Sequence, residues 1–390
     1  MSSSEQSLGR REAIPVLYTR GSHYDVGYDI GRTFRGLIED FLKNFTFLHQ
    51  ELLPAYTTQR GRQAYDATLG LLRGTYPHYL RELEGTAAGA RVPFLHLMLL
   101  HVGRQMLGGG APTQTSSKPP HGCSTVCSNY PGRPLLGHTE DALNEVMNHI
   151  YIVSAHITED QTTSPGQAEK KARSERFTSL CYAGYLPGFC MSCNQHGLVF
   201  SVNVLFPTHV HVAKTPPYFL TRALLAAQTL QEAEDVLKDQ GAGAGDGFSV
   251  NMAFTRQEGN ILFHNAEVAP PLPGQNESQL SILTINTGEH FMHANKYLRL
   301  SVPEDLEYED ASSSHRHARA QACPEPDCRA ALLELLSDTQ DAEYPIFREG
   351  QEGVSTVTLG IFDIREGTWS LYMKNPRTSS LLVSLPINLE

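Results

Sequence analysis

The chain has 390 residues, a formal net charge of −11, and 40% hydrophobic residues. This length fits one large domain or two ordinary ones, and the apolar content is typical of a globular protein. The acidic balance argues against nucleic acid and anionic membranes as partners.

Signals for membrane insertion or secretion are not found in the sequence. No run approaches the 18 or more apolar residues that a membrane span needs, and the first residues lack the apolar core of a signal peptide. We therefore expect a cytoplasmic protein whose seven cysteines are reduced. Cys190-x-x-Cys193 lacks the second ligand pair of a structural zinc site. We expect neither a metal nor a cofactor.

The N-terminal third is predicted to be helical. Apolar residues recur at intervals of three and four, and Ser22 with Asp25 fits a capping box at the first helix start. Residues 108–120, rich in Pro, Ser and Gly, break the periodicity and predict an exposed linker. Residues 1–122 are therefore expected to form a helical N-terminal segment. The predicted helices span residues 26–48, 64–83 and 93–106.

After this linker the pattern changes to strands, so residues 123–390 are expected to form the body of the protein. Pro131-Gly-Arg-Pro134 is typical of the turn of a hairpin, and the polar stretch 158–176 predicts a mobile surface insert. Helices are predicted within 217–240 and 312–336. Strands are predicted at 125–129, 135–138, 149–157, 178–182, 197–205, 248–255, 260–265, 281–286 and within 354–372.

The Gly122-Cys123 dipeptide lies between the helical segment and the strand-rich body. If the bond between the two residues is cut, Cys123 carries both a thiol and an α-amine. An α-amine has a pKa of about 7.7–8.0 and can accept the thiol proton near neutral pH. One residue then supplies nucleophile and base. Gly-Cys is also a common dipeptide, and Cys123 can instead be a small buried core residue.

Other residues can support this chemistry. Asp141 follows Cys123 by 18 residues, so a hairpin would return it beside Cys123, where its carboxylate can orient the α-amine; it can also be an ordinary loop acid. An asparagine inside a strand is disfavoured by propensity, so Asn251 is a candidate donor to an oxyanion. Asn203 has the same surroundings and competes with it.

Four stretches in order resemble the isopenicillin-N acyltransferase family of N-terminal-nucleophile hydrolases. They are Gly21–Gly31; Gly122-Cys123 with Gly137–Asp141; Phe248–Phe254 with Ala266-Glu267; and Met292–Tyr297 with Ser313-x-x-Arg316-x-x-Arg319. The resemblance implies an α+β fold, a four-layer αββα sandwich. It also implies self-cleavage before Cys123, pieces that stay associated, and a site that Arg316 reaches. His138 departs from the family, in which this position is often Arg or another polar residue.

The chain length and the junction position are most similar to a branch that hydrolyses β-alanyl conjugates of biogenic amines. Such small-molecule amides carry a terminal ammonium, which requires a carboxylate or carbonyl oxygens when buried. Glu140 flanks the site in sequence, and the other candidate carboxylates are Glu145, Asp246 and Glu267.

The amine half of such a substrate is a flat ring, which suits aromatic walls. Tyr182, Tyr185 and Phe189 are candidates, although each can also be ordinary packing, and His138 can be a strand residue or a substrate contact. Four functions stay open: a hydrolase of β-alanyl amides, a hydrolase of other N-acyl amides, an acyltransferase that passes the acyl group to an amine, and a non-enzymatic binding protein. Higher oligomers also stay open.

Overall fold

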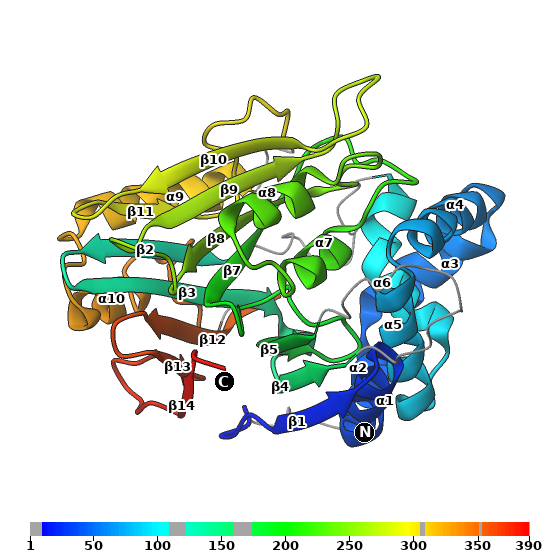
Figure 1. Ribbon diagram of the computed structural model, residues 1–390, viewed down its shortest axis with the longest axis horizontal. Helices are drawn as coiled ribbons and strands as arrows, with labels where there is room; N and C mark the ends of the chain where they lie inside the picture. The colour runs from blue at the N-terminus through cyan, green and yellow to red at the C-terminus, as the bar shows by residue number, and fades with distance from the viewer. Residues whose placement is uncertain (1–9, 109–121, 159–173, 305–308, 351–352, 390) are drawn as a thin grey trace, which may run out of the picture.

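The computed structural model describes residues 10–108, 122–158, 174–304, 309–350 and 353–389. Two β-sheets face each other, and helices cover their outer faces (Figure 1). This four-layer αββα sandwich confirms the predicted fold class. The first sheet has the order β1 (Val16–Gly21), β4 (Ile150–Ile157), β5 (Glu175–Tyr182), β6 (Ser192–Asn194), β7 (Leu198–Leu205), β8 (Gly247–Phe254), β9 (Phe263–Ala269), β10 (Gln279–Ile285). The second has the order β11 (His290–His293), β2 (Ser124–Tyr130), β3 (Arg133–Leu143), β12 (Val354–Asp363), β13 (Thr368–Tyr372), β14 (Val383–Pro386).

The helices divide between the two outer layers, on opposite sides of the sheets in Figure 1. The second sheet is covered by α9 (Glu309–Ala322) and α10 (Arg329–Leu336), because leucines of α10 pack on apolar residues of β2 and β3. The other layer contains α1 (His23–Thr33), α2 (Arg35–Asn44), a π-helical turn (Leu48–Leu52), α3 (Leu53–Thr57), α4 (Gln59–Thr75), α5 (Pro77–Ala90), α6 (Phe94–Leu107), α7 (Pro217–Leu224) and α8 (Leu230–Lys238).

Two of the predicted helices are interrupted. The helix expected over 26–48 breaks at Phe34, whose ring stacks on Tyr151 of β4 with centroids 3.9 Å apart. The helix expected over 64–83 breaks before Pro77, which cannot continue a helix but fits its first turn. The predicted capping box of Ser22 and Asp25 is present.

The N-terminal segment also contributes a strand that the sequence pattern did not indicate. β1 pairs in parallel with β4, from Val16 opposite Ile152 to Gly21 opposite Ile157. Only alternate residues of β1 are partly buried, and the others are exposed. Few apolar residues are therefore needed in this strand, and the sequence pattern does not mark it clearly. Most of the predicted linker (109–121) and of the predicted insert (159–173) lies outside the described residues.

The hairpin of β2 and β3 sets the geometry around Cys123. Gly132, with φ of 71°, allows the tight turn between the strands. The register places Ser124 opposite Thr139, so Glu140 and Asp141 come next to Cys123. The predicted hairpin is confirmed.

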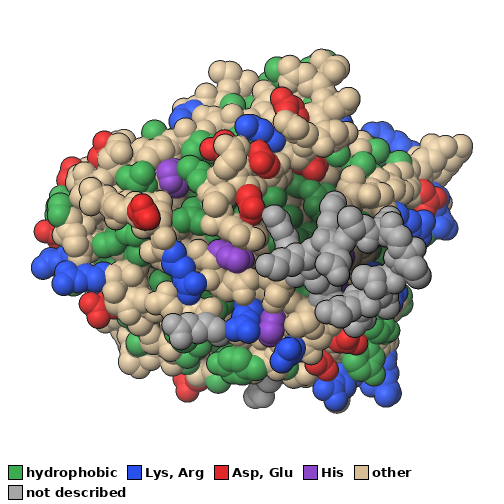
Figure 2. Space-filling model, viewed as in Figure 1, with side chains coloured by type: hydrophobic (Ala, Val, Ile, Leu, Met, Phe, Trp, Pro, Cys, Tyr) green, Lys and Arg blue, Asp and Glu red, His purple; other side chains and the backbone are tan. Residues whose placement is uncertain are grey.

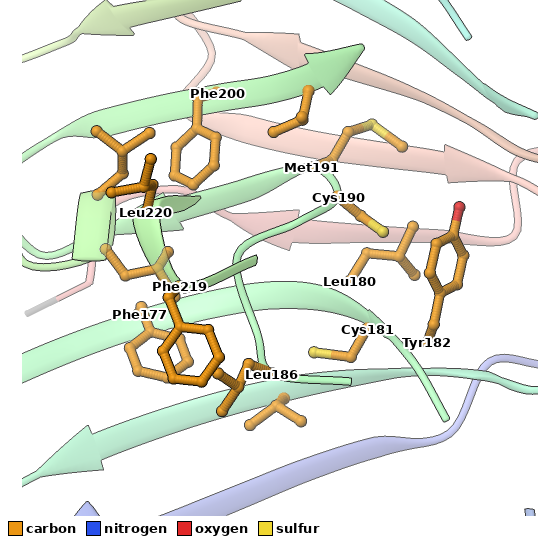
Figure 3. Packing of buried hydrophobic residues seen from close by; sticks show 14 of the residues in the cluster. Phe177, Leu180, Cys181, Tyr182, Leu186, Cys190, Met191, Phe200, Phe219 and Leu220 are labelled. Carbon is orange, nitrogen blue, oxygen red and sulfur yellow. The ribbon is translucent and has the colours of Figure 1, made fainter. Parts of the chain in front are cut away.

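The larger hydrophobic core lies between the sheets and under the N-terminal helices. Figure 3 shows one part of it, in which side chains from β5, β7 and α7 lie together. The face in Figure 2 has acidic and basic side chains interspersed. None of the helices in the described ranges has the length and apolar character needed to cross a bilayer.

A buried ion cluster joins the N-terminal segment to the body. Arg222 of α7 is fully buried, and its guanidinium lies 2.8 Å from the Glu82 carboxylate and 2.9 Å from that of Glu175. Nδ1 of His23 also lies 2.9 Å from the Glu82 carboxylate. Burial alone would raise the pKa of Glu82, but Arg222 and His23 outweigh it and lower the pKa to about 2. Arg222 thus neutralises carboxylates from both parts of the chain.

We expect Arg222→Met to destabilise the protein by about 3–5 kcal/mol, because it leaves two carboxylates buried without their cation. Chemical unfolding at neutral pH measures this loss. Arg32→Met is the matched control, since Arg32 forms an exposed pair with Asp29 and its loss should cost at most about 0.5 kcal/mol. Equal effects of the two substitutions would contradict the role given to Arg222.

Candidate active site

Cys123 directly precedes β2, and its side chain is buried between the sheets. Its Sγ lies 3.6 Å from Oε1 of Glu140 and 3.4 Å from the backbone nitrogen of Asp141, which donates to it. The structure therefore brings Cys123 beside Asp141, as its spacing predicted, but the contact is with the Asp141 backbone. Burial raises the pKa of the thiol, and the carboxylates of Glu140 and Asp141 raise it further. In the intact chain the thiol is therefore protonated.

Arg316 of α9 is fully buried and holds the junction. Its Nη1 donates to the carbonyl oxygens of Gly122 and Cys123, each at 2.8 Å, and its Nη2 donates to Oδ1 of Asn295 at 2.9 Å. The bond between Gly122 and Cys123 thus lies within reach of a permanent positive charge. A Cβ added to Gly122 would lie 2.3 Å from Nδ2 of Asn295, so only glycine fits here without rearrangement.

A row of amide side chains crosses the first sheet towards Cys123. Asn203 donates from Nδ2 to the Cys123 carbonyl oxygen at 2.9 Å. Asn251 donates to Oδ1 of Asn203, and Asn265 to Oδ1 of Asn251, both at 2.8 Å. Arg299 donates to Oδ1 of Asn265 at 2.7 Å. Of the two predicted asparagines, Asn203 contacts Cys123, and Asn251 stands one hydrogen bond behind it.

Glu140 points to the Cys123 side of β3. The hydroxyl of Tyr182 donates to its Oε1, and a ring nitrogen of His138 lies 3.1 Å from its Oε2. The other ring nitrogen of His138 lies 2.7 Å from Oγ1 of Thr125. His138, predicted as either a strand residue or a substrate contact, is thus a fully buried member of the cluster.

The side chain of Asp141 has different surroundings. Its Oδ1 accepts a hydrogen bond from Oγ1 of Thr356 at 2.7 Å, and its Oδ2 lies 3.3 Å from Nε of Arg348. Burial raises the pKa of Asp141 to about 6, although Arg348 and the Thr356 hydrogen bond act to lower it. The carboxyl therefore changes charge within the physiological range.

Aromatic side chains continue outwards from Tyr182. The rings of Tyr182 and Tyr185 are 6.0 Å apart between centroids, those of Tyr185 and Tyr218 5.1 Å, and those of Phe189 and Tyr218 4.1 Å. Tyr185, Phe189 and Tyr218 are half-buried. The predicted aromatic residues therefore form one connected group, to which Tyr218 of α7 is an addition.

The same cluster has donor atoms that can bind a metal ion. Sγ of Cys123, a ring nitrogen of His138 and a carboxylate oxygen of Glu140 lie within 4.8 Å of one another. Three such donors with an open position would suit zinc. Within the protein, His138 contacts Thr125 and Glu140 accepts a hydrogen bond from Tyr182. The expected absence of a metal stays a prediction.

Besides Tyr218, Asn265 and Arg299, three residues that contact the junction or Asp141 were not among the predicted ones. Asn295 lies in the Met292–Tyr297 stretch, whose match to the family was a usable signal. Arg348 and Thr356 come from a distant part of the chain, and nothing in their local sequence points to Asp141.

Comparison with known proteins gives consistent matches. Residues 128–378 match the family described as Acyl-coenzyme A:6-aminopenicillanic acid acyl-transferase. The chain is 42% identical over 388 residues, 99% of each chain, to the Beta-alanyl-dopamine/carcinine hydrolase of Drosophila melanogaster. Two solved structures of altered forms of conjugated bile acid hydrolase from Clostridium perfringens match with 12% and 11% identity and TM-scores of 0.39 and 0.41, each over 68% of this chain and 92% of that chain. The family resemblance inferred from the sequence is confirmed.

The pKa of Asp141 leads to a pH-dependent prediction. The Asp141 carboxyl has a pKa of about 6 in the folded chain and about 4 in the unfolded chain. Between these pH values the folded chain keeps the carboxyl protonated, whereas the unfolded chain does not. Relative to high pH, protonation of Asp141 favours the folded chain. This stabilisation is fully present below about pH 4 and is lost as the pH rises through about 6. Thr356→Val removes a donor to the carboxylate and should raise the pKa further.

We therefore expect Thr356→Val to destabilise the protein by about 1–2 kcal/mol more at pH 8 than at pH 5, because the lost hydrogen bond matters most to the ionised carboxylate. Unfolding in urea at the two pH values measures the difference. Thr356→Ser keeps the hydroxyl and should follow the wild type. An equal cost of Thr356→Val at both pH values would rule out the assigned ionisation.

Proposed function

Because this chain belongs to the acyl-coenzyme A:6-aminopenicillanic acid acyl-transferase family, we propose that it is a self-processing amidohydrolase whose nucleophile is Cys123. It cuts its own Gly122–Cys123 bond and then hydrolyses β-alanyl amides of biogenic amines. The smaller piece comprises residues 1–122, and the catalytic body starts at Cys123. The observation that carries the proposal is the hydrogen bond from Arg316 to the carbonyl oxygen of Gly122, the residue directly before Cys123.

Self-cleavage starts with attack of Cys123 Sγ on the carbonyl carbon of Gly122. The thiol gives up its proton, and negative charge develops on the Gly122 oxygen, to which Arg316 donates. A donor aimed at developing charge in a dry site strongly lowers the barrier. The carbon–nitrogen bond then breaks, and the Cys123 nitrogen takes up the proton that the thiol gave up. Water adds to the resulting thioester and releases the Gly122 carboxylate and the Cys123 thiol.

Amide hydrolysis repeats this chemistry on a substrate. The new α-amine of Cys123 accepts the thiol proton, and Sγ attacks the acyl carbon. The amine product leaves with a proton, and water hydrolyses the acyl-Cys123 thioester to the free acid. Asn203 donates to the Cys123 carbonyl and so orients the nucleophile, with Asn251 fixing Asn203 from behind.

The named activity of the Drosophila melanogaster relative supports the substrate class. The aromatic group of Tyr182, Tyr185, Phe189 and Tyr218 supports it independently, because flat amine rings stack on aromatic walls. An acyltransferase would use the same thioester but pass the acyl group to an amine. Products formed with and without an added amine distinguish the two activities.

We expect the wild-type chain to yield two pieces on a denaturing gel, the second with Cys123 at its N-terminus. Cys123→Ala and Cys123→Ser should stay intact and lack amidase activity, because both lose the thiol. Intact mass and turnover of β-alanyl-dopamine measure these outcomes. An uncut wild type, with unchanged activity in both variants, would refute the mechanism.

Arg316→Met should slow self-cleavage by about 10²–10³-fold, the usual cost of losing one donor to an oxyanion. Pulse-labelled expression followed by quantification of the two pieces measures the rate. Arg319→Met is the matched control on the same helix, since Arg319 binds Asp338 rather than the junction. Its cleavage rate should match the wild type, and equal slowing in both variants would argue against a direct role of Arg316.

A further inference from the structure

Glu140 differs from the other buried carboxylates in its partners. In the described ranges, each of the others lies within 4.0 Å of an arginine nitrogen. The pairs are Glu82 and Glu175 with Arg222, Asp141 with Arg348, Asp246 with Arg104, Glu267 with Arg299, and Asp338 with Arg319. This pairing is expected, because a buried charge is costly unless an opposite charge compensates it.

Glu140 is 3% exposed, and within the described part of the chain no arginine or lysine is paired with it. Its partners are the hydroxyl of Tyr182, the ring of His138 and the thiol of Cys123. The hydroxyl and thiol are neutral here, and a histidine ring carries charge only when protonated. The carboxylate next to the nucleophile therefore lacks a permanent cation.

We propose that Glu140 binds the terminal ammonium of the substrate's acyl chain and thereby selects amides whose acyl chain carries an ammonium, such as β-alanyl amides. This inference rests on the proposed function, since it assumes that the acyl group is carried by Cys123. The substrate supplies the cation that arginine supplies at every other buried carboxylate of the described chain.

The distances suit this role. In a β-alanyl thioester the ammonium nitrogen is four bonds from Sγ, which places it on the order of 5 Å away. Oε1 of Glu140 lies 3.6 Å from Sγ. A hydrogen bond of about 2.9 Å between the ammonium nitrogen and Oε1 is compatible with both of these distances, so neither Cys123 nor Glu140 has to move. A neutral chain would leave the carboxylate uncompensated.

The same observation separates the carboxylates that the sequence left as alternatives. Asp246 is paired with Arg104 at 2.6 Å, and Glu267 accepts from the backbone of residues 298–300 and lies 3.6 Å from Arg299. Both are already compensated by the protein. Glu145 is only half-buried, in the short turn Asn144–Val146, so its charge can stay hydrated.

The test compares two substrates of equal shape, β-alanyl-dopamine and butanoyl-dopamine, in which a methyl group replaces the ammonium. The wild type should prefer β-alanyl-dopamine in kcat/KM by about a hundredfold or more, as for a buried charge pair. Glu140→Gln should lower this ratio to about tenfold or less, mainly because kcat/KM for the charged substrate, β-alanyl-dopamine, falls. Glu140→Asp keeps the charge and should retain an intermediate ratio. Glu145→Gln is the matched control and should keep the wild-type ratio.

Glu140 also contacts the thiol, so Glu140→Gln can impair maturation. The wild-type ratio and the Glu140→Asp ratio then decide the question. Equal kcat/KM for both substrates in the wild type would overturn the proposed ammonium site but would leave the proposed amidohydrolase function standing. An equal loss on both substrates in Glu140→Gln would assign Glu140 to the catalytic step. A wild type that neither cuts itself nor hydrolyses either amide would instead reject the proposed function.

Discussion

The buried guanidinium of Arg316 is the constraint on which the junction depends. It donates to the carbonyl oxygens on both sides of the Gly122–Cys123 bond, and so holds this peptide bond in place. Few waters compete with a fully buried donor, so its charge acts at nearly full strength on the oxygen it faces. The close approach of Asn295 then explains why a glycine precedes the cysteine.

Strand geometry separates two neighbouring acids into different roles. Successive side chains of a strand point to opposite faces, so Glu140 faces Cys123 and Tyr182, whereas Asp141 faces Thr356 and Arg348. The charge of Asp141 is compensated by Arg348, whereas Glu140 has no arginine or lysine partner in the described residues. A carboxylate held without a permanent cation is destabilising in an empty site. That cost is consistent with a site whose binding partner brings the positive charge.

Sequence reasoning reached the parts of this site that depend on local pattern. The Pro131-Gly132 turn signals the hairpin, and the hairpin alone brings Asp141 back beside Cys123. The choice between Asn203 and Asn251 depends on something else. Both lie inside strands with apolar neighbours, and only the packing of the first sheet on β2 puts Asn203 against the Cys123 carbonyl. Arg348 and Thr356 were missed for the same reason, since the contacts with Asp141 span more than 200 residues.

Cutting the junction would remove one covalent link but few of the contacts that position the nucleophile. Strand β2 is held by its register with β3 and β11, neither of which precedes residue 123. The N-terminal segment is held separately, by β1 pairing with β4 and by Glu82 binding Arg222. Non-covalent contacts would therefore hold both parts in place after cleavage. In the cleavage that we propose, the new α-amine would form within a site that is already assembled, so the proposed gain in reactivity would come from the amine itself rather than from a rearrangement of the fold.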